Sequence, residues 1–545
     1  MIGLMAVVLA FSLAAASCGG DDKSTTGDNT KKSGTKDSAK PQPGGSMTLA
    51  LEAENSGGWC LPAAQLAASG IQIANAIYDP LVILDSDYQW KPYLAETVTP
   101  NADSTVWTLK LRSGVTFSDG SPLNADIVKE NLDLTYGEPA ATARTGIKPL
   151  LFAFVYSNIA SVDKVDDMTI AVNMKQPWTT FPFALAGSRN GIIGRAQIDA
   201  GPDGCKEKLV GTGPFQLVSW TRNQQLETKR NPNYWRKDAN GVQLPYLDSL
   251  TFKPIEGGEN RLAALEGGTV DAIQTSGATQ INEIKKSPDK YNLIPEAEGR
   301  HEVTYGQMNI SKAPFDDPAI RLALLQAVDR DALNDIMTDG ESTIANQPFD
   351  SKVLGYVDGL ELPKYDPDAA AKVLKGKNLT FRLSYTTDPT TKLAMEDIKR
   401  QLGDVGVAVT IEEKDQSTLI NSMLSGDFDA LFTRNHPGTD PDNQYIWWHS
   451  GSPVNFGRIN DPQMDQLLEQ GRAESDTAKR KTIYQDVAKL FADKVYNIWA
   501  YYAKWAFGTN KKVHNLGYNT LPDGSKGTGL NWGWTYLPEV WVDQN

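Results

Sequence analysis

The chain has 545 residues, a formal net charge of −14 and a sequence pI near 5.0. That length predicts two or three domains, and the 40% share of hydrophobic residues is sufficient to build their cores. The acidic balance argues against nucleic acid and anionic membrane surfaces as partners, because both repel a negatively charged protein.

The first 17 residues have the pattern of a secretory signal peptide. The apolar run from Ile2 to Ala16 is shorter than the roughly 20 residues that a membrane-spanning helix needs. The small residues that end this run, followed by Cys18, resemble a bacterial lipobox, in which the cysteine is lipidated and becomes the mature N-terminus. We therefore expect a signal peptide at residues 1–17 and a lipid anchor at Cys18. The alternative is a plain signal peptide with a chance cysteine.

Residues 18–46 are mostly small and polar. Apart from its prolines, Ala39 is the only apolar side chain between Cys18 and Met47. Such a segment cannot bury enough surface to offset the entropy lost on ordering. We expect a disordered tether that holds the folded part of the protein away from the membrane.

Two further cysteines remain, Cys60 and Cys205. An extracellular location permits disulfides, and with Cys18 lipidated these two form the only pair left. We hypothesise that they are bonded, with free buried thiols as the alternative. Nothing in the sequence marks a histidine partner that would make either one a catalytic nucleophile.

Strands and helices are predicted to alternate along the rest of the chain. Hydrophobic patterning predicts strands at 47–52, 81–84, 107–112, 380–385 and 407–411. Helices are expected at 65–78, after Asn124, after Asp476, and where an aspartate-proline pair can cap a first turn, at Asp317, Asp366 and Asp461. This alternation indicates the α/β class.

A series of short motifs occurs in a fixed order between residues 77 and 126, at 77–85, 92–96, 107–112, 114–120 and 122–126. Further motifs follow at 211–215, 231–235, 261–271 and 314–331. In order, spacing and residue type the series resembles the family 5 extracellular solute-binding proteins, the peptide, opine and nickel binders of ABC importers.

The resemblance implies a two-lobed periplasmic-binding-protein-like fold, class II and of the large type, that encloses its ligand between the lobes. It places lobe I at residues 47–300 and 507–545, with an inserted subdomain at about 85–207, and lobe II at 301–506. The implied function is capture of a small solute, above all a peptide or peptide-like molecule. The implied partners are an ABC permease and ATPase, served by a monomer that needs no cofactor.

Candidate ligand contacts follow from the resemblance and from side-chain chemistry. Trp59 lies on the loop after the first strand, where the family approaches its ligand, and the segment that starts at Arg434 resembles the cleft-facing loop of lobe II. Of Trp447 and Trp448, at most one is expected to line the cleft. The full set is Trp59, Tyr305, Arg434, Asn435, His436, Trp447 and Asn455, with packing roles as the alternative.

One position departs from the peptide binders. They typically carry an aspartate three residues before the aspartate-proline pair, where it binds the free amine of a peptide. Here the pair is Asp440 and Pro441, and the position holds Pro437. The aromatic, amide and imidazole groups of the candidate set would also suit a sugar, an aromatic ligand or a blocked peptide. A nickel chelate as ligand, and a surface lipoprotein without a transport role, are further alternatives.

The motifs of an enzyme or a metal site do not occur. The sequence contains neither Gly-x-Ser-x-Gly nor His-Glu-x-x-His. Its four histidines form no array: His301, His436, His449 and His514. We therefore predict no enzymatic activity, no catalytic residue and no metal site.

Overall fold

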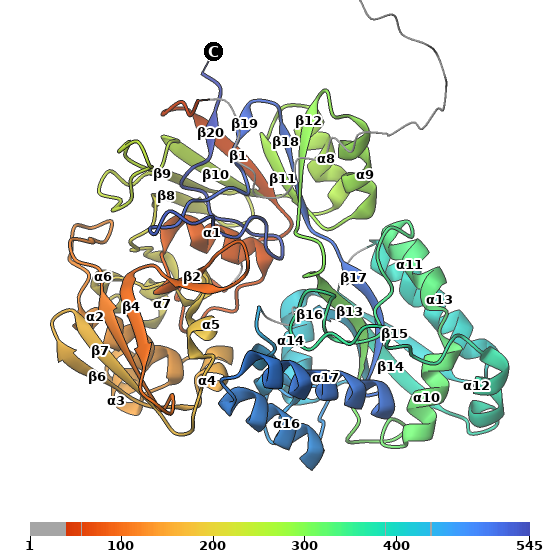
Figure 1. Ribbon diagram of the computed structural model, residues 1–545. Coiled ribbons are helices and arrows are strands. Elements are labelled where there is room, and N and C mark those ends of the chain that lie inside the picture. Colours follow the sequence, from red (N-terminus) through yellow and green to blue (C-terminus); the bar gives the residue numbers. More distant parts are fainter. Residues whose placement is uncertain (1–39, 56, 387–388, 436–438, 545) are drawn as a thin grey trace, which may run out of the picture.

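Two mixed β-sheets flanked by helices form the two lobes of the protein (Figure 1). The computed structural model describes residues 40–55, 57–386, 389–435 and 439–544. The predicted signal peptide, Cys18 and most of the predicted tether lie outside these residues. In the described part of the chain, no helix combines the length and apolar character needed to cross a membrane.

Lobe I is the part built on the seven-stranded sheet, whose order is β12-β18-β11-β1-β10-β9-β8. Its middle strand β1 (Ser46–Leu51) pairs in parallel with β10 and β11. The other strands are β8 (Phe215–Thr221), β9 (Gln225–Arg230), β10 (Ser249–Pro254), β11 (Ala272–Thr275), β12 (Tyr291–Pro295) and β18 (Ala506–Asn510). Its helices include α1 (Ala68–Ile77), α8 (Gly258–Glu266) and α9 (Ala278–Lys286), and the short pair β19 (Val513–His514) and β20 (Trp541–Val542) lies near the C-terminus.

A four-stranded antiparallel sheet, in the order β4-β5-β7-β6, forms a subdomain at the side of lobe I (Figure 1). A hairpin of β2 (Val82–Leu84) and β3 (Trp90–Pro92) leads from α1 into it. Its strands are β4 (Ala95–Pro100), β5 (Val106–Leu111), β6 (Ile159–Asp166) and β7 (Thr169–Met174). Its helices are α2 (Ala125–Tyr136), α3 (Pro139–Thr145), α4 (Leu151–Val155), α5 (Phe181–Leu185), α6 (Arg195–Ile198) and α7 (Gly201–Glu207).

Lobe II is the part built on the five-stranded sheet, whose order is β15-β14-β16-β13-β17. The strands are β13 (Glu302–Met308), β14 (Thr380–Thr386), β15 (Ala408–Lys414), β16 (Ala430–Asn435) and β17 (Asn497–Ala503). The helices are α10 (Pro318–Ala327), α11 (Arg330–Thr338), α12 (Pro367–Leu374), α13 (Pro389–Asp404), α14 (Gln416–Ser425), α15 (Tyr445–Trp448), α16 (Pro462–Ala473) and α17 (Thr477–Lys494).

The aspartate-proline pairs begin helices as predicted. The side chains of Asp317, Asp366 and Asp461 accept hydrogen bonds from backbone N–H groups of the first turn at 2.8, 2.9 and 2.8 Å. These amides would otherwise lack a partner, because the first turn of a helix has no preceding carbonyls. The helix predicted at 65–78 is shorter, since it begins only at Ala68. The α/β class is confirmed.

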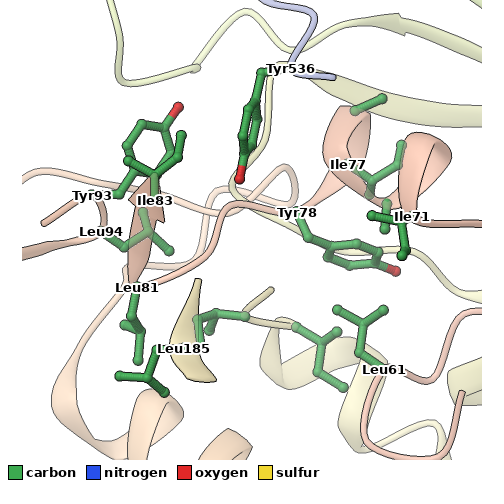
Figure 2. Packing of buried hydrophobic residues seen from close by; sticks show 14 of the residues in the cluster. Leu61, Ile71, Ile77, Tyr78, Leu81, Ile83, Tyr93, Leu94, Leu185 and Tyr536 are labelled. Atoms are coloured by element: carbon green, nitrogen blue, oxygen red, sulfur yellow. The ribbon is translucent and has the colours of Figure 1, made fainter. Parts of the chain in front are cut away.

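In the core of lobe I, α1 packs near β2 and the C-terminal segment. Figure 2 shows Ile71 and Tyr78 close to Leu61, with Tyr536 reaching in from the C-terminal segment. Beside this core Cys60 forms a disulfide with Cys205 of α7, and their Cα atoms are 4.9 Å apart. The disulfide therefore ties the loop after β1 to the subdomain.

The chain passes between the two sheets at residues 296–301 and 504–505, which we call the crossovers. The two segments lie side by side, because the N–H of Glu296 donates to the carbonyl of Trp505 at 3.0 Å. The C-terminal segment joins them through the N–H of Trp532, which donates to Glu296 Oε1 at 2.7 Å. Two adjacent connections of this kind allow one lobe to rotate against the other as a hinge.

Glu296 is 3% exposed, and its Oε2 has no hydrogen-bond partner. Burial, supported by the charges of Glu302 and Asp350, raises the pKa of this carboxyl well above its ordinary value. Below the unfolded-state pKa of about 4.3 both states are protonated; above it the unfolded state ionises first, so stability falls as pH rises. Glu296→Gln keeps the accepting oxygen and removes the charge. We expect a melting temperature above that of the parent at about pH 7.5, by calorimetry.

The same comparison at about pH 4 is the control, because the carboxyl is then mostly protonated in both states and the advantage of Glu296→Gln should shrink. An equal difference between variant and parent at both pH values would contradict a raised pKa of Glu296 in the folded protein.

Candidate ligand-binding site

A cavity of about 1660 Å³ lies between the lobes. Lobe I contributes the residues just after β1, the start of α1, α4 and the segments 256–261 and 276–282. Lobe II contributes β13, the end of β16 and residues of α11, α14 and α15. Residues of both crossovers and the side chains of Trp532 and Trp534 complete the wall. Because both lobes form the wall, a molecule in the cavity would be enclosed by their closure.

Four of the predicted contacts line this cavity: Tyr305, Arg434, Asn435 and Trp447. Arg434 and Asn435 are the last residues of β16, whereas Trp447 lies on α15. Trp448 also borders the cavity, whereas the sequence predicts at most one of these two tryptophans there and the other in the core. Trp448 is nevertheless mainly a core residue, since it is 5% exposed.

Trp59 does not reach the cavity, contrary to expectation. Its side chain is 0% exposed and packs edge-on against Trp220, with ring centroids 5.7 Å apart. The backbone N–H of Trp59 donates to the carbonyl of Lys206 at 2.9 Å, next to the disulfide. The bond between Cys60 and Cys205 thus holds this loop against α7, and the tryptophan fills the core there.

Asn455 does not line the cavity either, although its neighbours Val454 and Phe456 do, and its amide closes a loop. Its Nδ2 donates to the carbonyl of Ile459 at 2.7 Å, and its Oδ1 accepts from the N–H of Ile459 at 3.0 Å. A longer bond of 3.2 Å joins Nδ2 to the carbonyl of His449. Asn455 is 2% exposed, and its side-chain amide is hydrogen-bonded within the loop. The remaining candidate, His436, lies outside the described residues, as does Pro437.

Arg434 occupies the centre of a polar network that joins the lobes. Its guanidinium donates to Ser276 Oγ at 2.9 Å and lies 3.3 Å from Glu52 Oε2, both in lobe I. Its Nε lies 3.6 Å from Oε2 of Glu302, and the guanidinium stacks over the ring of Trp505 at 4.5 Å. We call these five residues the hinge network. It surrounds the place where the crossovers meet the cavity.

The two arginines beside Glu52 are already paired with carboxylates. Burial lowers the pKa of Arg434, but the charges of Glu302 and Glu52 outweigh it and hold that pKa above its ordinary value. Arg261 Nη2 lies 3.3 Å from Glu52 Oε1. The whole wall carries more carboxylates than cations: Glu52, Glu256, Glu259, Glu298, Glu302, Asp339, Glu341 and Asp415 against Arg189, Arg261, Lys285, Arg434 and Lys504. This surplus favours a ligand with a positive group over an additional anion.

Residues 89–456 match the family described as bacterial extracellular solute-binding proteins, family 5 Middle. The chain belongs to this family. Among relatives, this family 5 protein is 26% identical over 469 residues to the glutathione-binding protein GsiB of Pectobacterium atrosepticum, across 83% of this chain and 87% of that protein.

Solved structures share the fold of this family 5 protein. The binding protein AgaA of A. tumefaciens R10, in complex with agropinic acid, has a TM-score of 0.78 at 23% identity and covers 92% of this chain and 99% of its own. The oligopeptide-binding protein AppA of Bacillus subtilis, in complex with a nonapeptide, has a TM-score of 0.78 at 21% identity, over 93% and 100%. These comparisons confirm the predicted two-lobed class II fold.

A second contact joins the lobes of this family 5 protein, away from the crossovers. Asp442 of lobe II, on a short 3-10 helix (Pro441–Gln444), accepts from Trp178 Nε1 at 2.7 Å and from Thr180 Oγ1 at 2.8 Å, both in lobe I. It also accepts from Nε of Arg472 in α16 at 2.8 Å. We call these four residues the closure cluster. All are at most 7% exposed, so opening the cleft would hydrate a buried carboxylate.

The histidines of the described chain have partners other than a metal. His301 Nδ1 lies 2.7 Å from Asp350 Oδ2, His449 Nε2 lies 3.2 Å from Glu469 Oε1, and His514 Nε2 lies 2.9 Å from Asp543 Oδ1. None of these three borders the cavity. Among the residues that the structure describes, no group of three or more histidine, cysteine, aspartate or glutamate side chains is placed to hold a metal ion.

Sequence reasoning missed most of the hinge network and the closure cluster. Glu52 follows β1 and Ser276 follows β11, so neither differs locally from a surface residue. They meet Arg434 only because β1, β11 and β16 end near the same part of the cleft. Trp178 and Asp442 are 264 positions apart and carry no shared motif.

Proposed function

We propose that this protein is the extracytoplasmic solute-binding component of an ABC importer, which captures a peptide or peptide-like solute and delivers it to a permease. The cavity of about 1660 Å³ with walls from both lobes carries this proposal. Its volume exceeds the roughly 300–1,000 Å³ of common small-molecule sites, which leaves room for a peptide. The relative GsiB is named a glutathione-binding protein, and the structural neighbour AppA was solved in complex with a nonapeptide. Both ligands support the peptide class. The protein acts by binding and not by catalysis.

Lobe closure is the proposed mechanism. Residues 47–300 with 507–545 would move against residues 301–506 about the crossovers, as a monomer. The hinge network stays near the axis of this motion, whereas the closure cluster forms only when the lobes meet. The permease complex would recognise the closed form, so ligand occupancy is communicated as a change of shape.

Ligand identity is tested by native mass spectrometry of the full chain carrying Cys18→Ser, purified from cells grown in rich medium. We expect a small molecule to remain bound under native conditions and to be released on denaturation, with the mass of a short peptide. If the protein is empty, a thermal-shift screen of peptides, opines, sugars and nickel chelates replaces it. Stabilisation by a sugar or a nickel chelate, and by no peptide, would overturn the peptide class.

We further propose that Cys18 is lipidated after removal of residues 1–17 and that residues 18–46 form the tether. The parent should then sediment with membranes and partition into detergent, whereas Cys18→Ser should appear in the soluble extracytoplasmic fraction. Ser17→Ala is the matched control, because it keeps a small residue before the cysteine. Equal partitioning of parent and Cys18→Ser would contradict the anchor.

A further inference from the structure

The wall of the cavity is chemically uneven. One part is formed by α4 of the subdomain together with α14, α15 and the loop after it, and its side chains are apolar. We call this part the apolar compartment, defined by six wall residues: Leu150, Phe154, Met423, Leu424, Trp447 and Phe456. The hinge network, by contrast, lies at the ends of strands around the crossovers. Figure 1 shows α4 well separated from the crossovers, close to lobe II.

The members of the apolar compartment come together from both lobes. Phe154 of lobe I packs with Met423 and Trp447 of lobe II against one apolar cluster that includes Phe456. The rings of Trp447 and Phe456 are 5.4 Å apart. Closure of the cleft therefore completes this part of the wall, and a ligand group held here would contact both lobes at once.

This compartment keeps apolar surface in contact with solvent. Leu150 is 46% exposed and Leu424 is 37% exposed, although both border the cavity. Phe154, Met423 and Trp447 are only partly buried. Apolar side chains grouped on a concave wall, with a paired polar network elsewhere in the same cavity, are typical of a site for an amphipathic ligand.

On the basis of the proposed function, we infer that the apolar compartment binds a bulky aliphatic or aromatic side chain of the peptide-like ligand, and that the protein selects peptides which carry one. Burying a leucine or phenylalanine side chain favours binding by roughly 10- to 100-fold over a serine. Met423 has a flexible thioether, which lets the compartment adapt to either shape. An acidic side chain is disfavoured, because the wall already has a surplus of carboxylates.

The test uses isothermal titration of the full chain carrying Cys18→Ser with trialanine peptides in which one position is serine, aspartate, leucine or phenylalanine. Each of the three positions is varied in turn. We expect leucine and phenylalanine at one position to bind roughly 10- to 100-fold more tightly than serine there, and aspartate to bind most weakly. Equal affinity across the panel would overturn the inference and leave the proposed function intact. If no peptide bound, the peptide function itself would fall.

A pair of variants assigns the preference to the compartment. Phe154→Ser combined with Met423→Ser should reduce the leucine-over-serine ratio to roughly threefold or less, and this ratio is the readout because both residues belong to the binding wall. Leu393→Ser is the matched control, since Leu393 is apolar, 66% exposed and outside the cavity wall. It should keep the full ratio. A ratio that survives in the double variant would show that another part of the wall reads the side chain.

Discussion

Replacing both Cys60 and Cys205 by alanine should destabilise the protein by about 5 kcal/mol, because the disulfide closes a loop of about 145 residues in the unfolded chain. Cys60 and Cys205 are 2% and 0% exposed. The alanine methyl groups would lie in the same apolar surroundings, and the substitution adds no unpaired polar group. The main loss is therefore the restriction of the unfolded state. Differential scanning calorimetry should show a lower melting temperature for the transition that contains lobe I.

Reduction of the parent provides the control for this prediction. A reducing agent should lower the melting temperature of the parent toward that of the Cys60→Ala and Cys205→Ala double variant, and it should leave the double variant unchanged. Equal melting temperatures for the oxidised parent and the double variant would show that the bond contributes little stability.

The disulfide should also affect the cavity. The loop that it holds runs from β1 to α1, and Gln197 Nε2 donates to the carbonyls of both Trp59 and Cys205, at 3.0 and 2.9 Å. The same loop contains Leu66, which borders the cavity and whose carbonyl accepts from Arg189 Nη2 at 2.7 Å. A more mobile loop would therefore disturb the part of the cavity wall at Leu66. We expect the double variant to bind peptides more weakly even at temperatures where it remains folded.

Local signals in the sequence predicted the local structure well. An aspartate before a proline favours a helix start wherever it occurs, because the carboxylate accepts from amides of the first turn and the proline needs no partner for its nitrogen. Asp317 and Asp461 therefore cap helices as predicted. The alternation of apolar and polar residues along a strand likewise predicts which of its faces is buried, as in residues 106–111. These features depend on neighbours in the chain.

The ligand wall could be predicted only in part, because it depends on contacts between distant segments. Arg434 begins the segment that resembles the cleft-facing loop of lobe II, and Trp447 comes soon after this segment. Both residues line the cavity. Trp59 follows the first strand, but contacts with Lys206 and Trp220 turn it into the core. Nothing near Trp59 in the sequence indicates those partners. The prediction for Asn455 failed because of local contacts, since its amide bonds to the backbone of Ile459 in its own loop.

Asp440 and Asp442 show how one short motif holds two roles. Asp440 accepts from the N–H of Asp442 at 3.0 Å and pairs with Arg480 Nη1 at 2.8 Å, so its role is structural. Asp442 instead receives donors from the opposite lobe. The sequence distinguishes them only by their position relative to Pro441. The functional difference arises from the approach of Trp178 and Thr180 when the lobes meet.

Thr180→Val should weaken ligand binding by roughly 10-fold or more, and Trp178→Phe by a similar factor, because each removes a donor to the buried carboxylate of Asp442. In an open form Asp442 would still pair with Arg472, which is in the same lobe, whereas Thr180 and Trp178 would bond to water. The lost bonds thus belong to the closed form alone. Apparent affinity falls with the population of the closed form, so the whole penalty appears in the dissociation constant.

Titration with the tightest peptide of the trialanine panel measures this effect, and small-angle scattering of the ligand-bound proteins shows whether closure is lost. Thr99→Val is the matched control, because Thr99 is exposed on β4 of the same subdomain. Its affinity should equal that of the parent. Thr180→Val should also melt near the parent's temperature without ligand if the open form predominates there. A variant that binds as tightly as the parent would mean that the ligand and the hinge network stabilise the closed form. The closure cluster would then form on closure without contributing to its stability.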